Sequence, residues 1–253
     1  MSPAFEFAPQ WHEHRDEAAW SAAIADSSAD ALRRDLATGH ARLLLSGGST
    51  PAPAYRALAN YGLDWARVRV ALVDERWLPP GDADSNALLV QETLLQGRAA
   101  AAQLEPILIR DRGLDESVRE ANRHANASSV ALLGMGPDGH TASLFPGARG
   151  LAEALASGDD YVSVDAAGCA GAGNFPLRIS LTPAGLARAT CACCWSAAKP
   201  SANCSNARSP EPIPLNSRCA PCSPFPARRC TSTGAPDACQ AAIPSHCRHR
   251  APA

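Results

Sequence analysis

The sequence is poor in lysine, has little net charge and lacks long hydrophobic runs. Lys199 is the single lysine beside 22 arginines, and the formal net charge is −2. A nearly neutral chain offers no positive field for nucleic acid or an anionic membrane, so neither is expected as a partner. No apolar run reaches the roughly 18 residues of a membrane span, and the N-terminus has no signal-peptide pattern. We therefore expect a cytoplasmic protein, with a small anion as a permitted ligand.

The composition changes sharply near residue 190. Residues 191–253 hold nine of the ten cysteines and ten of the 21 prolines, but only three Leu, Ile or Val residues. The 46% hydrophobic content of the whole chain therefore lies mainly before this point, where it suffices for one sizeable domain. The sequence predicts a folded domain over residues 1–190 and an irregular tail over residues 191–253.

Short apolar runs alternate with segments of helical periodicity along the first 190 residues. We predict strands at 41–45, 69–73, 106–109, 129–133, 161–164 and 176–181, and helices at 16–38, 53–61, 85–96, 114–126 and 183–189. After Thr190 no apolar pattern with either period is found, so no further strand or helix is predicted. The alternation indicates an α/β fold with a mostly parallel sheet and helices on both faces. Ligands of such sheets bind at the carboxyl ends of the strands.

A glycine loop, residues 46–51, follows the first predicted strand of this alternation. Gly47 and Gly48 let backbone N–H groups approach an anion, and Ser49 and Thr50 add hydroxyl donors. The helix that starts next places its positive end at the same point. The loop is typical of a phosphate site, although a turn formed for steric reasons alone has similar glycines.

The second predicted strand of the alternation leads into Asp74-Glu75-Arg76. A carboxylate and a guanidinium group two residues apart can orient a catalytic group and bind an anion. A solvated surface ion pair is the alternative interpretation.

The most specific segment is 134–146, which follows the predicted strand at 129–133. Its glycines 134, 136 and 139 form a tight loop that presents Asp138 and His140. An imidazole is the side chain best matched to proton transfer near neutral pH. No helix pattern with a third glycine at the required spacing follows, so a dinucleotide site is not predicted.

Taken together, the three segments resemble the 6-phosphogluconolactonase family over about residues 5–190. The resemblance implies a Rossmann-like α/β fold shared with aminosugar-phosphate isomerases. It also implies hydrolysis of 6-phosphoglucono-1,5-lactone, a phosphosugar lactone, to 6-phosphogluconate in the oxidative pentose phosphate pathway. No metal or organic cofactor is implied, and no oligomeric state is predicted.

The same resemblance assigns roles to individual residues. His140 would be the general base that activates water, Asp74 would orient the site, and Arg76 would bind the anionic substrate. Lys199 stands roughly where the family has a phosphate-binding lysine, but the strand that would position it is not predicted. The implied substrate-binding residues are Gly47, Gly48, Ser49, Thr50, Asp138, Gly139 and Lys199.

Two other functions remain open at this point. A glucosamine-6-phosphate deaminase resembles the chain in its glycine loop and Asp-Gly-His, but such deaminases carry an aromatic residue at the position of Arg76. They also have Phe-Asn-Glu-Pro where this chain has Leu144-Phe-Pro146. A sugar-phosphate binder without catalytic activity is the second alternative, because the family's C-terminal strands are not predicted here.

The cysteine-rich tail has two interpretations of its own. Its Ala, Arg, Pro, Ser and Cys content is typical of GC-rich codons read out of frame, so one hypothesis is a reading-frame shift. The other is a zinc-binding module built on Cys219 and Cys222, although one such pair is a weak zinc signal.

Overall fold

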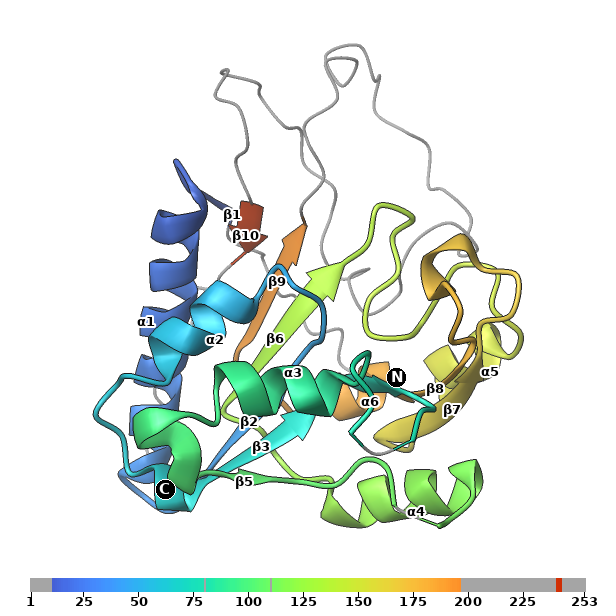
Figure 1. Ribbon diagram of the computed structural model, residues 1–253, viewed down its shortest axis with the longest axis horizontal. Helices are drawn as coiled ribbons and strands as arrows, with labels where there is room; N and C mark the ends of the chain where they lie inside the picture. Colours follow the sequence, from blue (N-terminus) through green and yellow to red (C-terminus); the bar gives the residue numbers. More distant parts are fainter. Residues whose placement is uncertain (1–10, 80, 110, 197–239, 243–253) are drawn as a thin grey trace, which may run out of the picture.

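The computed structural model describes residues 11–79, 81–109, 111–196 and 240–242 (Figure 1). Its strands are β1 (Trp11–Glu13), β2 (Ala41–Leu45), β3 (Val68–Leu72), β4 (Asp74–Arg76), β5 (Gln103–Leu104), β6 (Val130–Met135), β7 (Tyr161–Asp165), β8 (Leu177–Leu181), β9 (Ala192–Ser196) and β10 (Gln240–Ala242). Its α-helices are α1 (Glu17–Leu36), α2 (Ala52–Leu58), α3 (Asn86–Thr93), α4 (Leu114–His124), α5 (Leu151–Ala156) and α6 (Pro183–Leu186). Short 3₁₀ helices are η1 (Trp65–Arg67), η2 (Gly97–Ala101) and η3 (Ala170–Ala172).

The strands form a large sheet and a small one. The large sheet has the order β1-β10-β9-β6-β2-β3-β5, in which β9, β6, β2, β3 and β5 are parallel and β10 pairs antiparallel with both β9 and β1. Helices α1 and α2 lie side by side along one flank (Figure 1), and α4 packs against β7. The prediction of an α/β fold with a mostly parallel sheet flanked by helices is confirmed.

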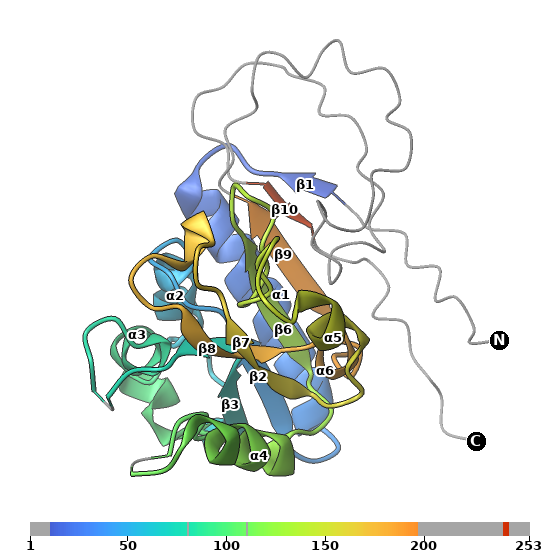
Figure 2. The same ribbon diagram turned by 90° about the vertical axis from the view of Figure 1, so that its right-hand side faces the viewer.

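The small sheet is antiparallel, with the order β4-β8-β7. Figure 2 shows β7 and β8 running across the direction of β2 and β3. The chain passes from the large sheet to the small one within a single residue, Val73, between β3 and β4. Sequence periodicity predicted β7 and β8 as strands but not their separation into a second sheet.

Helix α1 forms because its sequence provides both a cap and an apolar face. The Asp16 side chain accepts a hydrogen bond from the Ala19 N–H at 2.8 Å, which satisfies one of the free donors at the helix start. Trp20, Ile24 and Leu32, spaced by four and eight residues, are almost fully buried. They pack in one core cluster with the entirely buried strand β2.

An internal ion pair lies at the amino end of the parallel strands. Arg42 of β2 donates from Nε and Nη2 to Glu105, at 3.0 Å and 2.7 Å, and from Nη1 to the Asn126 carbonyl and the Ser128 hydroxyl. Burial lowers the pKa of Arg42, but the hydrogen bond and charge of Glu105 outweigh this effect and the pKa is raised. The pair joins three segments at the rim opposite the glycine loop.

The strand predicted at 106–109 is not formed, and the nearest strand is the two-residue β5. The Glu105 N–H still donates to the Val70 carbonyl at 2.7 Å, but Pro106 follows and has no N–H to continue the ladder. Ile107 is buried outside any strand, and the Ile109 N–H donates to Ser117 Oγ instead. The apolar run reflects core packing without sheet pairing.

The prediction that no regular structure follows Thr190 is also wrong. Strand β9 pairs in parallel with β6, from Ala131 opposite Ala192 to Met135 opposite Ser196. The side chains of Cys191, Cys193 and Trp195 are buried, so they alternate as expected for a strand with one face in the core. Buried cysteine behaves as a small apolar residue, which a count of Leu, Ile and Val does not register.

Within the residues that the structure describes, none of the helices combines the length and the apolar character that crossing a membrane requires.

Arg42→Met should destabilise the fold by about 3–5 kcal/mol, because it leaves the buried Glu105 carboxylate without its partner. Arg69 is the matched control, since it lies opposite Arg42 in the parallel register of β3 but is exposed. Arg69→Met should change the free energy of urea unfolding by less than about 0.5 kcal/mol. Equal effects of the two substitutions would contradict a stabilising role for the ion pair.

Candidate active site

A cleft of about 250 Å³ lies at the carboxyl ends of β2 and β6. Because β2, β3 and β6 are parallel, the segments that leave them meet at one edge of the sheet. The lining residues are Ser46, Gly47, Gly48, Thr50, Pro51, Asp74, Arg76, Asn86, Gly134, Met135, Gly136, His140, Ala142, Gly171, Arg178 and Trp195. All three predicted motifs therefore contribute to one cleft.

Two side chains from neighbouring helices, Tyr55 and Asn86, contact the glycine loop. Tyr55 of α2 donates its hydroxyl hydrogen to the Ser46 carbonyl at 2.8 Å, and burial raises the pKa of this tyrosine. Asn86 packs so closely on Gly47 that a Cβ atom at Gly47 would lie 1.9 Å from Asn86 Oδ1. Glycine at position 47 is thus required by the approach of a side chain from α3.

Asp74 is the centre of a buried polar network. Its Oδ2 accepts a hydrogen bond from the Ser143 hydroxyl at 2.6 Å and lies 3.9 Å from Arg178 Nη1. Asn86 Nδ2 donates to the Asp74 carbonyl at 2.9 Å and to Oδ1 at 3.3 Å. Asp74 is 6% exposed, so this carboxylate depends on protein donors rather than on water.

Glu75 points away from the cleft and closes the start of α3. Its carboxylate accepts hydrogen bonds from the Arg76, Asn86 and Ala87 N–H groups and from the Ser85 hydroxyl, at 2.8–2.9 Å. Burial raises the pKa of Glu75, against the opposing effect of these four donors. A surface ion pair is therefore the wrong interpretation for this segment, because both of its carboxylates are buried.

Two arginines from neighbouring strands face the cleft. Arg76 of β4 and Arg178 of β8 are cross-strand partners, so their side chains leave the same face of the small sheet. Arg76 Nη1 donates to the Asp84 carbonyl at 2.5 Å. Arg178 is buried and donates to the Phe175 carbonyl at 2.8 Å and the Ala172 carbonyl at 2.7 Å.

His140 is oriented by Asp138 from within its own loop. Nδ1 of His140 lies 2.5 Å from Asp138 Oδ1, and the imidazole ring packs on Phe145 with centroids 4.4 Å apart. A Cβ atom at Gly136 would lie 2.3 Å from the imidazole, so only glycine permits this arrangement. Burial raises the pKa of Asp138, but the hydrogen bond and charge of His140 more than offset this, and the pKa is lowered.

The structure brings most of the predicted site residues together. Asp74, Arg76, His140, Gly47, Gly48 and Thr50 line the cleft, and Asp138 contacts it through His140. Ser49 is exposed and, like Gly139, is not among the lining residues. Lys199 and the proposed zinc-binding cysteines lie outside the described residues.

Sequence reasoning did not select Arg178, Ser143 or Trp195. Arg178 interrupts a strand whose next three residues are buried, and a charged residue at such a position is a usable signal. Ser143 gave no signal because a serine in a loop is common. Trp195 was assigned to the tail, yet it is 4% exposed and forms part of the cleft wall.

Guanidinium groups, backbone donors and an imidazole around a cleft at strand ends define an α/β class of protein that acts on small anionic ligands. Residues 15–214 match the family described as glucosamine-6-phosphate isomerases/6-phosphogluconolactonase. The chain belongs to this family.

Individual relatives support the same assignment. The chain is 47% identical over 175 residues to the 6-phosphogluconolactonase of Xylella fastidiosa (strain 9a5c), a match that covers 68% of this chain and 73% of the relative. It superposes on a 6-phosphogluconolactonase structure from Shewanella baltica OS155 with a TM-score of 0.63 and 31% identity, over 70% of this chain and 76% of that one. A monomeric glucosamine-6-phosphate deaminase shares the fold, with a TM-score of 0.56 at 17% identity, over 71% of this chain and 78% of that one.

Asp138→Asn should reduce stability in a pH-dependent way. Because the folded-state pKa of Asp138 is lowered, its carboxylate stabilises the fold above the ordinary pKa of 3.8. This stabilisation is lost as the pH falls through the lowered pKa. Urea unfolding should show a difference of up to about 1 kcal/mol from the parent near pH 6, and this difference should shrink as the pH falls through the lowered pKa of Asp138. Asp159→Asn, at an exposed aspartate, is the control, and a pH-independent difference for Asp138→Asn would contradict the assignment.

Proposed function

We propose that this chain hydrolyses 6-phosphoglucono-1,5-lactone to 6-phosphogluconate. The observation that carries the proposal is an imidazole fixed by Asp138 at a cleft that also contains a glycine loop and two arginines. Membership of the family and the names of its relatives support the same reaction. The product belongs to the oxidative pentose phosphate pathway, and we place the enzyme in the cytoplasm.

His140 acts as the general base in this proposal. The Asp138 carboxylate, whose pKa is lowered, accepts the hydrogen on Nδ1, which leaves Nε2 free to accept a proton. Nε2 takes a proton from water while the water oxygen bonds to the lactone carbonyl carbon. The bond from this carbon to the ring oxygen then breaks, and His140 returns the proton to that oxygen. The product is an open-chain acid.

The 6-phosphate binds at the glycine loop. Gly47, Gly48 and Thr50 line the cleft, where backbone N–H groups and the Thr50 hydroxyl would donate to the phosphate and Arg76 would add positive charge. Asn86 fixes Gly47 against α3 and Tyr55 fixes Ser46. A preformed site of this kind holds the lactone ring in one orientation relative to His140.

His140→Ala should reduce kcat/KM by about 10²–10⁴-fold, because it removes the proton acceptor. The measurement is hydrolysis of freshly generated lactone, corrected for spontaneous ring opening. His40→Ala is the matched control, since His40 is exposed and does not line the cleft, and it should retain the parent activity.

Two results would contradict the proposal. A folded parent without lactonase activity that still binds 6-phosphogluconate would be a sugar-phosphate binder. Release of ammonia from glucosamine 6-phosphate, with no lactone hydrolysis, would identify an isomerase of the deaminase type. An unchanged rate in His140→Ala would leave the lactonase intact but remove His140 as its base.

A further inference from the structure

Arg178 is a buried cation whose guanidinium group is only partly engaged by the hydrogen-bond acceptors that the structure describes. It is 5% exposed, and its Nε and Nη2 donate to the carbonyls of Phe175 and Ala172. Its Nη1 lies 3.9 Å from Asp74 Oδ2, within ion-pair range but beyond hydrogen-bond distance. The guanidinium group is therefore fixed in orientation while Nη1 retains donor capacity at the cleft.

Arg178 shares its immediate surroundings with His140. The Arg178 guanidinium carbon lies 5.2 Å from the centroid of the Phe145 ring, and His140 stacks on the same ring. The turn that accepts the Arg178 hydrogen bond at Ala172 also approaches His140, since a Cβ atom at Gly171 would lie 3.1 Å from His140 Nδ1. The base and this guanidinium group thus adjoin the same part of the cleft.

Arg76 is held by a different segment of the chain. Its hydrogen bond to the Asp84 carbonyl draws it toward the start of α3, whose first residue, Asn86, packs on Gly47 of the glycine loop. The two arginines are therefore held by different segments: Arg76 by a residue that precedes α3, and Arg178 by the turn that approaches His140.

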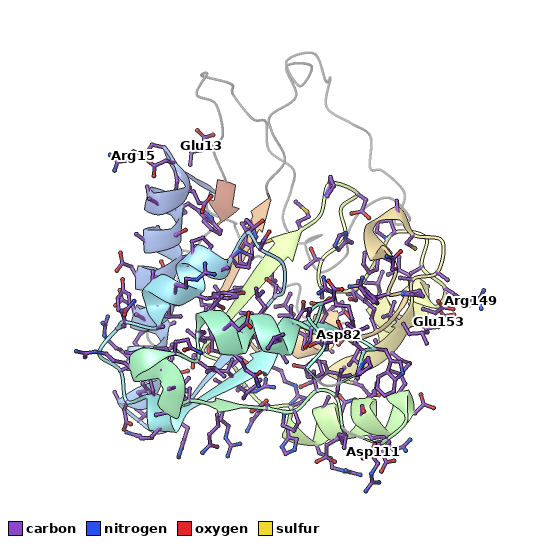
Figure 3. The ribbon with its side chains drawn as sticks, viewed as in Figure 1. Glu13, Arg15, Asp82, Asp111, Arg149 and Glu153 are labelled. Atoms are coloured by element: carbon purple, nitrogen blue, oxygen red, sulfur yellow. The ribbon has the colours of Figure 1, made fainter. Side chains whose placement is uncertain are left out.

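Other arginines do not compete for these roles. Of the described residues that line the cleft, Arg76 and Arg178 alone carry a permanent positive charge. Arg149 points outward beside Glu153 (Figure 3), with 87% of its side chain exposed. Burial lowers the pKa of Arg178, which Asp74 opposes and Arg76 reinforces, so an anionic ligand atom near Nη1 would favour its charged form.

We propose that Arg178 is a catalytic residue whose Nη1 donates to the lactone carbonyl oxygen and stabilises the negative charge that develops there, while Arg76 binds the 6-phosphate. This inference rests on the proposed lactonase activity. Water attack moves the carbonyl electron pair onto the oxygen, and a fixed donor at that oxygen binds the tetrahedral state more strongly than the substrate.

The test separates the two arginines by turnover and by binding. Arg178→Met should lower kcat by about 10²–10³-fold, as loss of a fixed oxyanion donor does, and should change the Kd of 1,5-anhydroglucitol 6-phosphate by less than about threefold. This ligand has the ring and the phosphate but no carbonyl group. Arg76→Met should raise the Kd of the same ligand by about tenfold or more and lower kcat less than Arg178→Met does. Kinetics of lactone hydrolysis and calorimetry supply these values.

A second substitution at the same position controls for loss of folding. Arg178→Lys keeps a positive charge but loses the planar fork, so it should lower kcat at an unchanged Kd for 1,5-anhydroglucitol 6-phosphate. Melting temperatures identify any variant that has lost its structure. Parallel losses of kcat and of anhydroglucitol phosphate binding in folded Arg178 variants would overturn the proposal, as would a kcat equal to that of the parent.

Failure of the proposed function can be distinguished from failure of this inference. If the folded parent has no lactonase activity, the proposed function fails, and binding of the product still tests Arg178. The carboxylate carbon of 6-phosphogluconate is the former lactone carbonyl carbon, so Arg178→Met should weaken this ligand at least about tenfold more than 1,5-anhydroglucitol 6-phosphate. Equal weakening of both ligands would overturn the role of Arg178.

Discussion

The buried carboxylate of Asp74 holds together the parts from which the cleft is built. It follows the single residue that separates the large sheet from the small one, and it contacts Ser143, Asn86 and Arg178. These partners come from the His140 loop, from α3 and from β8. Because a buried carboxylate is costly unless it is paired, its position obliges three distant segments to approach one point. The distance between His140 and the glycine loop follows from this network.

The parallel sheet does not form the site alone, because the small antiparallel sheet also contributes side chains to the cleft. Parallel strands bring the glycine loop and the His140 loop to one edge, but both cationic side chains of the cleft belong to antiparallel β4 and β8. Cross-strand pairing places Arg76 and Arg178 on one face, where like charges repel each other. Asp74 and the carbonyl acceptors of the two guanidinium groups offset this repulsion.

Local sequence patterns predicted the features that depend on neighbouring residues, such as where a buried strand begins and ends. Strand β2 has the predicted bounds because five consecutive buried residues are followed by Ser46 and two glycines. The roles of Ser143 and Arg178 depend on which distant segments meet, and periodicity contains no such information. The strand predicted at 106–109 failed because apolar side chains can fill a core without joining a ladder. Strand β9 was missed because cysteine and tryptophan supplied the buried positions that aliphatic residues usually occupy.

Strand β9 also shows that the unusual composition after Thr190 does not separate that segment from the site. Trp195 packs edge-on against Trp20 of α1, with ring centroids 5.7 Å apart, and its indole lies over Gly134, where a Cβ atom would be 3.4 Å from Nε1. The same side chain lines the cleft. Strand β9 covers the edge of β6, contacts helix α1 and forms a wall of the cleft. It therefore belongs to both the core and the site. The cysteine and proline content after Thr190 therefore does not mark the end of the core.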